Sequence, residues 1–257
     1  MLGNDVIDLQ DIDARPETFR PRFDERVFSA EERRVIARDD APLACRWAHW
    51  GAKESAYKLA RQLNPRFVFS PIQLTPRFEP AESPSESTLA ESSASNAHAP
   101  VSWTERRGRI GLPPEVGSLS KGVTHSMASS RVREIEVRSY ETEEWVHVIA
   151  MPLGSDWGAL VSSIEERSGE DPSRAVRELA IREIGRNLGV DSERLSIGRR
   201  GKIPKVDLDG GRTSLSLSFS HHGRFVAFAM TPQVDAGNEM IWTGQVIDTA
   251  RPTATSE

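Results

Sequence analysis

The chain has 257 residues, which is enough for one two-lobed domain or for two small domains. Hydrophobic residues make up 37%, a modest share, so part of the chain is expected to lie outside a packed core. Acidic residues outnumber basic ones, 38 to 33, and this balance argues against a nucleic-acid partner, because such affinity comes from many phosphate contacts. A local basic pocket for one polyphosphate is still compatible with it.

Cys45 is the only cysteine, which excludes an intramolecular disulfide and a zinc site built from cysteines. The N-terminal residues lack the basic start and the apolar run of a signal peptide. No stretch approaches the ~20 apolar residues that a membrane-spanning helix needs. The sequence therefore predicts a soluble, cytoplasmic protein without a membrane partner.

Composition changes along the chain and predicts its domain organisation. The predicted parts are a first lobe over residues 1–78, an insert over 79–130, a second lobe over 131–232 and a loose tail over 233–257. The insert is rich in Ser, Ala, Glu and Pro and has no sustained apolar pattern. Such a segment buries too little apolar surface to offset its chain entropy, so it is predicted to be disordered.

A strand is predicted at the start of the first lobe, over residues 2–9. Its alternation puts Asp5 on the same face as Ile7 and Leu9. A carboxylate near a core is costly unless it is paired or bound to a cation. Two interpretations of Asp5 stay open at this point: a cap on a neighbouring turn, or a ligand of a cation.

Two helices are predicted next. The first covers residues 29–38 and begins at a capping box formed by Ser29 and Glu32. The second covers 42–63, and one of its faces carries residues at three- or four-residue steps: Trp47, Gly51, Glu54, Lys58 and Arg61. Taken alone, Glu54 and Lys58 are typical of a surface ion pair. Flanking aromatic and small residues instead indicate a helix packed on several sides.

The second lobe is predicted to contain strands, helices and a hairpin. In chain order these are strands over 133–140 and 145–151, a helix with an apolar stripe at Trp157, Leu160, Val161 and Ile164, a helix over 172–188, a turn over 201–205, and a hairpin of 214–221 and 225–230. Asp171 suits the N-cap of the longer helix, and Gly189 suits its end. His221 continues the apolar face of the first hairpin strand, whereas His222 falls in the turn and is expected to be exposed.

The turn over 201–205 stands in a cluster of cations. Its members lie within seven positions: Arg199, Arg200, Lys202 and Lys205. A solvated loop is the simpler interpretation of such a cluster. A binding site for a phosphate ester is the alternative.

Three blocks of the chain carry motifs that occur together in one enzyme family. Residues 3–9 read GNDVIDL, similar to a Gly-x-Asp strand. Residues 26–32 read RVFSAEE and residues 50–58 read WGAKESAYK, similar to a Phe-Ser and a Trp-x-x-Lys-Glu-x-x-x-Lys signature. Residues 201–204 read GKIP and residues 218–226 read SFSHHGRFV, similar to a Gly-Lys-Pro and a Ser-His segment. Together these blocks resemble the 4′-phosphopantetheinyl transferase superfamily.

The resemblance implies a fold and a reaction. The fold would be the α+β 4′-phosphopantetheinyl transferase fold, with two lobes that each pack a small antiparallel sheet on a long helix. The reaction would transfer 4′-phosphopantetheine from coenzyme A to a serine of an apo acyl or peptidyl carrier protein, with Mg²⁺ as cofactor and 3′,5′-ADP as the leaving product. The carrier would serve fatty-acid, polyketide or nonribosomal-peptide synthesis, or another pathway.

The resemblance also implies roles for individual residues. Asp5 and Glu54 match the magnesium-binding carboxylates, and Glu54 also matches the general base for the carrier serine. Lys58 matches the lysine that contacts the pyrophosphate of coenzyme A. His221 matches a histidine that contacts a phosphate. Lys202 and Arg174 are expected near the nucleotide and its 3′-phosphate.

Two departures from the family pattern affect the expected architecture. Ile7 stands where larger members have a second acid, so water would complete the metal shell. The Ser-His motif comes last, as in the small holo-acyl-carrier-protein synthases, but it is preceded by strands and a long helix typical of the first lobe of the large members. We therefore expect a monomeric pseudo-dimer with its lobes in swapped order and coenzyme A between them. A small-type subunit that forms homotrimers is the alternative.

Other functions stay open beside the transferase. One is a non-catalytic relative that binds coenzyme A or a carrier protein. Another is a scaffold whose insert recruits partners through Trp103 and the basic run RRGR over residues 106–109. A further hypothesis is that the arginine-rich stretch over residues 15–26 docks an acidic carrier protein.

Overall fold

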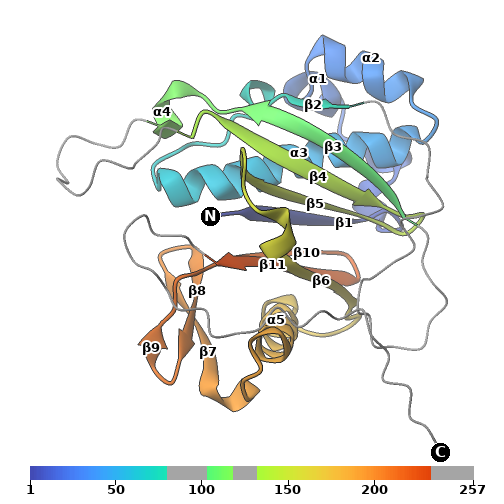
Figure 1. Cartoon of the computed structure of the whole chain (residues 1–257). Helices are drawn as coiled ribbons and strands as arrows, with labels where there is room; N and C mark the ends of the chain where they lie inside the picture. The colour runs from blue at the N-terminus through green and yellow to red at the C-terminus, as the bar shows by residue number, and fades with distance from the viewer. Residues whose placement is uncertain (80–102, 118–131, 233–257) are drawn as a thin grey trace, which may run out of the picture.

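The computed structural model describes residues 1–79, 103–117 and 132–232 (Figure 1). Its helices are α1 (Phe23–Val27), α2 (Ala30–Arg38), α3 (Pro42–Leu63), α4 (Pro114–Gly117) and α5 (Pro172–Leu188). Its strands are β1 (Gly3–Asp8), β2 (Pro76–Phe78), β3 (Thr104–Gly111), β4 (Glu134–Glu141), β5 (Trp145–Pro152), β6 (Val161–Glu166), β7 (Leu195–Arg200), β8 (Ile203–Leu208), β9 (Gly211–Arg212), β10 (Leu215–His222) and β11 (Phe225–Pro232). This mixture of helices and small antiparallel sheets agrees with the predicted α+β class.

The upper half of the molecule is a five-stranded sheet on a long helix (Figure 1). The strands lie in the order β1-β5-β4-β3-β2, all neighbours antiparallel, and α3 packs on one face. Two glycines permit the close approach of β1, α3 and β5. A Cβ at Gly3 would lie 2.0 Å from the carbonyl oxygen of Ser55, and a Cβ at Gly51 would lie 2.8 Å from a methyl group of Val148.

The lower half repeats the arrangement on a smaller scale. A three-stranded sheet in the order β10-β11-β6 packs on α5 around buried Leu217 and Phe228 (Figure 1). Asp171 caps the start of α5 by accepting the amide of Ser173, and Gly189 ends it in the left-handed conformation. A second small sheet, β7-β8-β9, contacts α5 and β10.

The two halves meet along β1, whose second edge faces β10. Its alternate amides, from Asn4, Val6 and Asp8, donate in that order to Ser218 Oγ at 3.1 Å, Ser220 Oγ at 3.1 Å and His222 Nδ1 at 3.2 Å. Side chains therefore take the place of a backbone ladder on this edge, which satisfies amides that would otherwise be buried without partners. Asp8 adds an ion pair with Arg224 across the same boundary at 2.9 Å.

Several predicted elements are confirmed. Strand β1 lies within the predicted 2–9, and α2 begins at the predicted capping box of Ser29 and Glu32. Helices α3 and α5 have the predicted bounds. Ile7 and Leu9 lie in the core on the α3 side, and the side chain of Asp5 also contacts α3. The alternation predicted for the first strand is therefore correct.

Three predictions are wrong. Residues 104–111, which fall in the predicted disordered insert, form β3 of the main sheet, because Ile110 is buried against α3 and Arg106 is held by acids. The predicted helix around Trp157 is a short 3-10 turn followed by β6, because the run after Leu160 alternates and pairs with β11. His222 lies in β10 and is half-buried.

Other predictions are extended or lie outside the described residues. Strands β4 and β5, expected in the second lobe, pair in the sheet of β1, so that sheet draws strands from both predicted lobes. The rest of the insert and the tail over 233–257 lie outside the described residues. No described helix is long and apolar enough to span a membrane.

Candidate active site

Asp5 lies at the boundary between the two halves of the molecule. Strand β1 presents its side chain toward α3, where Lys58 Nζ donates to Asp5 Oδ1 at 2.8 Å. Ser220 Oγ of β10 donates to the same oxygen, also at 2.8 Å. The carboxylate is only 13% exposed. Since both donors come from other elements, Asp5 is not a cap on a neighbouring turn.

Lys58 lies on the face of α3 that meets β1. Its ammonium group donates to the carbonyl oxygen of Asn4 and to Asp5 Oδ1, each at 2.8 Å, while its side chain stays 29% exposed. An ammonium group has three donors. Lys58 is thus held in place by the strand and is still open to solvent, which suits a cation that binds a phosphate oxygen.

Glu54 lies one turn before Lys58 on the same helix and is half-buried. Its pKa is raised to about 7, chiefly by burial and also by the nearby charge of Asp5, while the charge of Lys58 opposes the rise. The three predicted site residues of the first lobe are therefore close enough to act on one another. A carboxyl group whose pKa lies near neutral pH can accept and release a proton under ordinary conditions.

His221 reaches the same region from the lower half of the molecule. It stands at the end of β10 with an exposed side chain. Although the side chain is exposed, part of the ring is shielded from water, and this lowers the pKa of His221. The charge of Lys58 lowers the pKa too, and the charge of Asp5 raises it. The charges of Lys58 and Asp5 therefore act on His221, although the three residues come from different elements.

Lys202 and Arg174 are exposed and lie in the lower half. Lys202 is at the turn between β7 and β8, beside the exposed Arg199 and Arg200. Arg174 lies in the first turn of α5 and forms an ion pair with Glu178 at 3.4 Å. Arg199 Nη2 lies 3.4 Å from Ser173 Oγ at the start of α5, so the basic hairpin and the helix start are neighbours.

Sequence reasoning missed two residues beside this site. Ser220 was not assigned a role, and the structure shows that Ser218 and Ser220 of β10 are both buried against β1. Lys53 was not assigned a role, and it is fully buried in an ion pair with Glu32 at 2.6 Å. The one available signal for Ser220 was its place directly before His221 in the Ser-His segment.

Asp5 and Glu54 fit a magnesium site of the two-carboxylate kind. The charge of Asp5 helps to raise the pKa of Glu54, and a divalent cation near both would reverse that effect. Within the described ranges, no group of three or more His, Cys, Asp or Glu side chains gathers as a metal site. Magnesium commonly binds one or two carboxylates and takes its other ligands from water and substrate phosphates.

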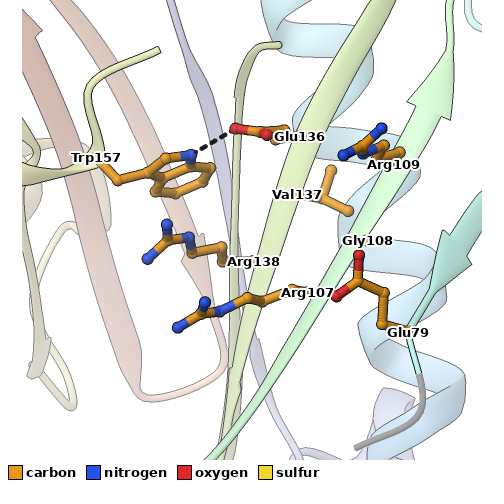
Figure 2. A pocket seen from close by; sticks show the side chains of 8 residues that line it. All are labelled: Glu79, Arg107, Gly108, Arg109, Glu136, Val137, Arg138 and Trp157. Carbon is orange, nitrogen blue, oxygen red and sulfur yellow. Dashed lines mark hydrogen bonds between the residues drawn. The ribbon is translucent and has the colours of Figure 1, made fainter. Parts of the chain in front are cut away.

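A separate cavity of about 210 Å³ lies on the outer face of β3 and β4 (Figure 2). Figure 2 shows Arg138 between Arg107 and Trp157, whose indole donates to Glu136 at 2.9 Å. None of the predicted site residues lines this cavity. The active-site assignment therefore rests on the contacts at β1, α3 and β10.

Comparison with known protein families gives a match over the first part of the chain. Residues 1–105 match the family model of the 4′-phosphopantetheinyl transferase superfamily. The match confirms the resemblance predicted from the sequence and contains Asp5, Glu54 and Lys58. Members of this superfamily are transferases that act on carrier proteins with coenzyme A as substrate. No curated protein and no solved structure gave a significant match.

The matched region ends within β3. Ser220, His221 and Lys202 therefore lie in the part of the chain that the superfamily model does not cover. The contacts of β10 with β1 place Ser220 beside Asp5, and the charges of Lys58 and Asp5 act on His221, whereas the expected place of Lys202 near the nucleotide stays a prediction.

Proposed function

We propose that this protein transfers 4′-phosphopantetheine from coenzyme A to a serine of an apo acyl or peptidyl carrier protein and releases 3′,5′-ADP. The observation that carries the proposal is the meeting of Asp5, Glu54 and Lys58 in one half-buried cluster inside the region that matches the superfamily. This combination of acids and a held cation suits a reaction at a pyrophosphate better than it suits a purely structural ion pair.

Each residue of the cluster has a chemical role in the proposed reaction. Asp5 and Glu54 would hold Mg²⁺, which, when bound, neutralises charge that develops on the pyrophosphate. Lys58 donates to a phosphate oxygen with the ammonium hydrogen that the strand leaves free. Glu54 accepts the proton of the carrier serine as its oxygen attacks the β-phosphorus. His221 stabilises the phosphates from the side of the second half.

The substrate would lie between the two halves of the chain. The basic hairpin residues, with Lys202 at the turn, and Arg174 on α5 supply cations from the lower half for the nucleotide and its 3′-phosphate. Their exposure leaves them accessible to an anionic ligand. Arginine and lysine bind phosphate esters through charge-assisted hydrogen bonds.

The two halves would form a pseudo-dimer within one chain, with lobe order opposite to that of large family members. Each half packs an antiparallel sheet on a long helix, and the site draws residues from both halves of the same chain. A monomer is therefore favoured over a homotrimer. Light scattering of the purified protein tests this directly, because a trimer would have three times the 28.5 kDa chain mass.

Intact-mass spectrometry of the carrier tests the proposed reaction. The protein is incubated with coenzyme A, Mg²⁺ and a panel of apo carrier proteins, with parallel samples that contain a chelator or carriers whose acceptor serine is changed to alanine. A mass gain of one phosphopantetheine arm that both controls abolish is expected. Transfer that persists in excess chelator would contradict the metal requirement. Binding of coenzyme A without transfer to any carrier would instead favour a non-catalytic relative.

A further inference from the structure

We propose that Ser220 is a positioning residue for Asp5, through which the second half of the chain orients a metal-binding carboxylate of the first half. The inference rests on the proposed function for the role of Asp5. Its structural basis is a single hydroxyl group that joins the strand and the carboxylate. Ser220 Oγ accepts from the amide of Val6 at 3.1 Å and donates to Asp5 Oδ1 at 2.8 Å.

The direction of these hydrogen bonds is determined by their partners. An amide only donates, so the oxygen of Ser220 acts as acceptor toward Val6. Its single hydrogen is thereby free for a carboxylate that only accepts when ionised. Ser220 is 6% exposed, so water competes little for the bond. The hydroxyl group is thus fixed by β1 and in turn fixes the rotamer of Asp5.

Both bonds to the carboxylate go to one oxygen. Ser220 and Lys58 each donate to Asp5 Oδ1 at 2.8 Å. Among the described residues no hydrogen bond reaches Oδ2, which leaves that oxygen for a cation. Hydrogen bonds to a ligand of this kind hold it in the geometry that the metal requires, and their loss commonly weakens metal binding 10–100-fold.

Ser218 provides a matched control two residues earlier on the same strand. Its hydroxyl oxygen accepts from the amide of Asn4 at 3.1 Å, the same distance as the bond between Ser220 and Val6. Ser218 is 4% exposed, similar to Ser220. Loss of either hydroxyl therefore leaves one buried amide of β1 without its acceptor. Only Ser220 also contacts Asp5.

The test measures Mn²⁺ binding by electron paramagnetic resonance on the full chain, with and without coenzyme A, for the wild type, Ser220→Ala and Ser218→Ala. Ser220→Ala is expected to raise the Kd for Mn²⁺ about 10-fold, the lower end of the range for such contacts. Ser218→Ala is expected to keep the Kd of the wild type. Each variant loses one bond to a backbone amide of β1, and Ser220→Ala also loses the bond to Asp5, so the unfolding temperature of Ser220→Ala should fall at least as far as that of Ser218→Ala.

Three results would overturn the inference. A wild-type Kd in Ser220→Ala would show that the hydroxyl does not position Asp5, while the proposed function would stand. Equal weakening in Ser218→Ala would assign the effect to the contact between the halves in general. Absence of Mn²⁺ binding by the wild type, with or without coenzyme A, would remove the metal site of the proposed function and this inference with it.

Discussion

Helix α3 carries two lysines that the same motif places five residues apart, and their surroundings differ sharply. Lys53 is fully buried, with its ammonium group 2.6 Å from Glu32 and bonded to the carbonyl oxygens of Pro71 and Leu74 at 3.0 and 2.9 Å. Lys58 is 29% exposed and bonded to Asp5 on β1. We call Lys53 with Glu32 the interior pair, and Lys58 with Asp5 the boundary pair.

The two pairs differ in role: the interior pair is structural, whereas the boundary pair is placed for chemistry. The interior pair joins α2 to α3, and Lys53 also donates to two carbonyl groups of the segment after α3; its ammonium group is fully buried and therefore out of reach of a substrate. The boundary pair, in contrast, leaves its cation and its carboxylate within reach of solvent. The family resemblance assigns a role to Lys58 alone, and the surroundings of the two lysines differ accordingly: Lys53 is buried with Glu32, whereas Lys58 stays partly exposed beside Asp5.

The largest effect is expected for Lys53→Met, which breaks the interior pair. The substitution leaves the carboxylate of Glu32, only 2% exposed, without its cation. Removal of one partner from a buried ion pair typically costs about 3–5 kcal/mol of the free energy of unfolding. Urea unfolding measures this loss, and the folded fraction should still catalyse transfer. A loss as small as that of Lys58→Met would show that the two pairs do not differ.

Lys58→Met is expected to affect catalysis more than stability. Loss of a cation that stabilises charge in the transition state lowers the rate about 100-fold. The boundary pair is partly exposed, so its contribution to the free energy of unfolding is about 1 kcal/mol or less. Steady-state kinetics with a carrier protein and urea unfolding check the two parts. Full activity in Lys58→Met would remove the assigned role.

His147 makes the free energy of unfolding depend on pH in the acid range. The Nε2 atom of this buried histidine of β5 lies 3.2 Å from the side-chain nitrogen Nδ2 of Asn4, and its pKa is lowered to about 3, chiefly by burial and also by the charge of Lys58. The unfolded chain binds a proton below about pH 6.5 that the folded chain does not bind. The stability is thus complete above pH 6.5 and falls as the pH drops toward 3.

Urea unfolding at pH 7.5 and pH 5 measures this effect in the wild type and in His147→Gln. The wild type should lose about 2 kcal/mol more than the variant between the two pH values, as linkage requires for a histidine that stays neutral when folded. Equal losses in the two proteins would show that His147 is protonated in the folded state.

The smallest effect is expected for the labelling rate of Cys45, which lies on the interior side of α3. The thiol is 1% exposed, and its burial, together with the charge of Asp39, raises its pKa to about 12. Since the thiolate is the reactive form, the native protein should react with a disulfide reagent only as fast as it unfolds. One thiol per chain should react in urea. Rapid labelling of the native protein would contradict the burial of this side.

The sequence predicted the local elements of the molecule better than its long-range contacts. Helix α3 was predicted with its observed bounds, because Pro42 starts it and a regular stripe of small and apolar residues continues to Leu63. The stripe around Trp157 matched a helical period over too short a run, and pairing with β11 made part of it a strand. Strand β3 was missed because its buried positions are few.

The candidate site was predicted in part. Asp5, Glu54 and Lys58 were identified through motifs, and the structure places them together. The bond from Ser220 to Asp5 joins residues 215 positions apart, so no local pattern indicates it. The buried role of Lys53 depends likewise on Glu32 and on two carbonyl groups that approach from other segments.

The single-turnover rate of transfer by Glu54→Gln distinguishes an active site at β1 and α3 from a structural cluster of charges. Intact-mass spectrometry follows a modified carrier over time for the wild type, Glu54→Gln and the control Glu31→Gln, whose side chain is exposed on α2. The account predicts a loss of about 100-fold or more in Glu54→Gln, typical of a missing general base, and a wild-type rate in Glu31→Gln. A wild-type rate in Glu54→Gln would contradict the assignment of this cluster as the active site.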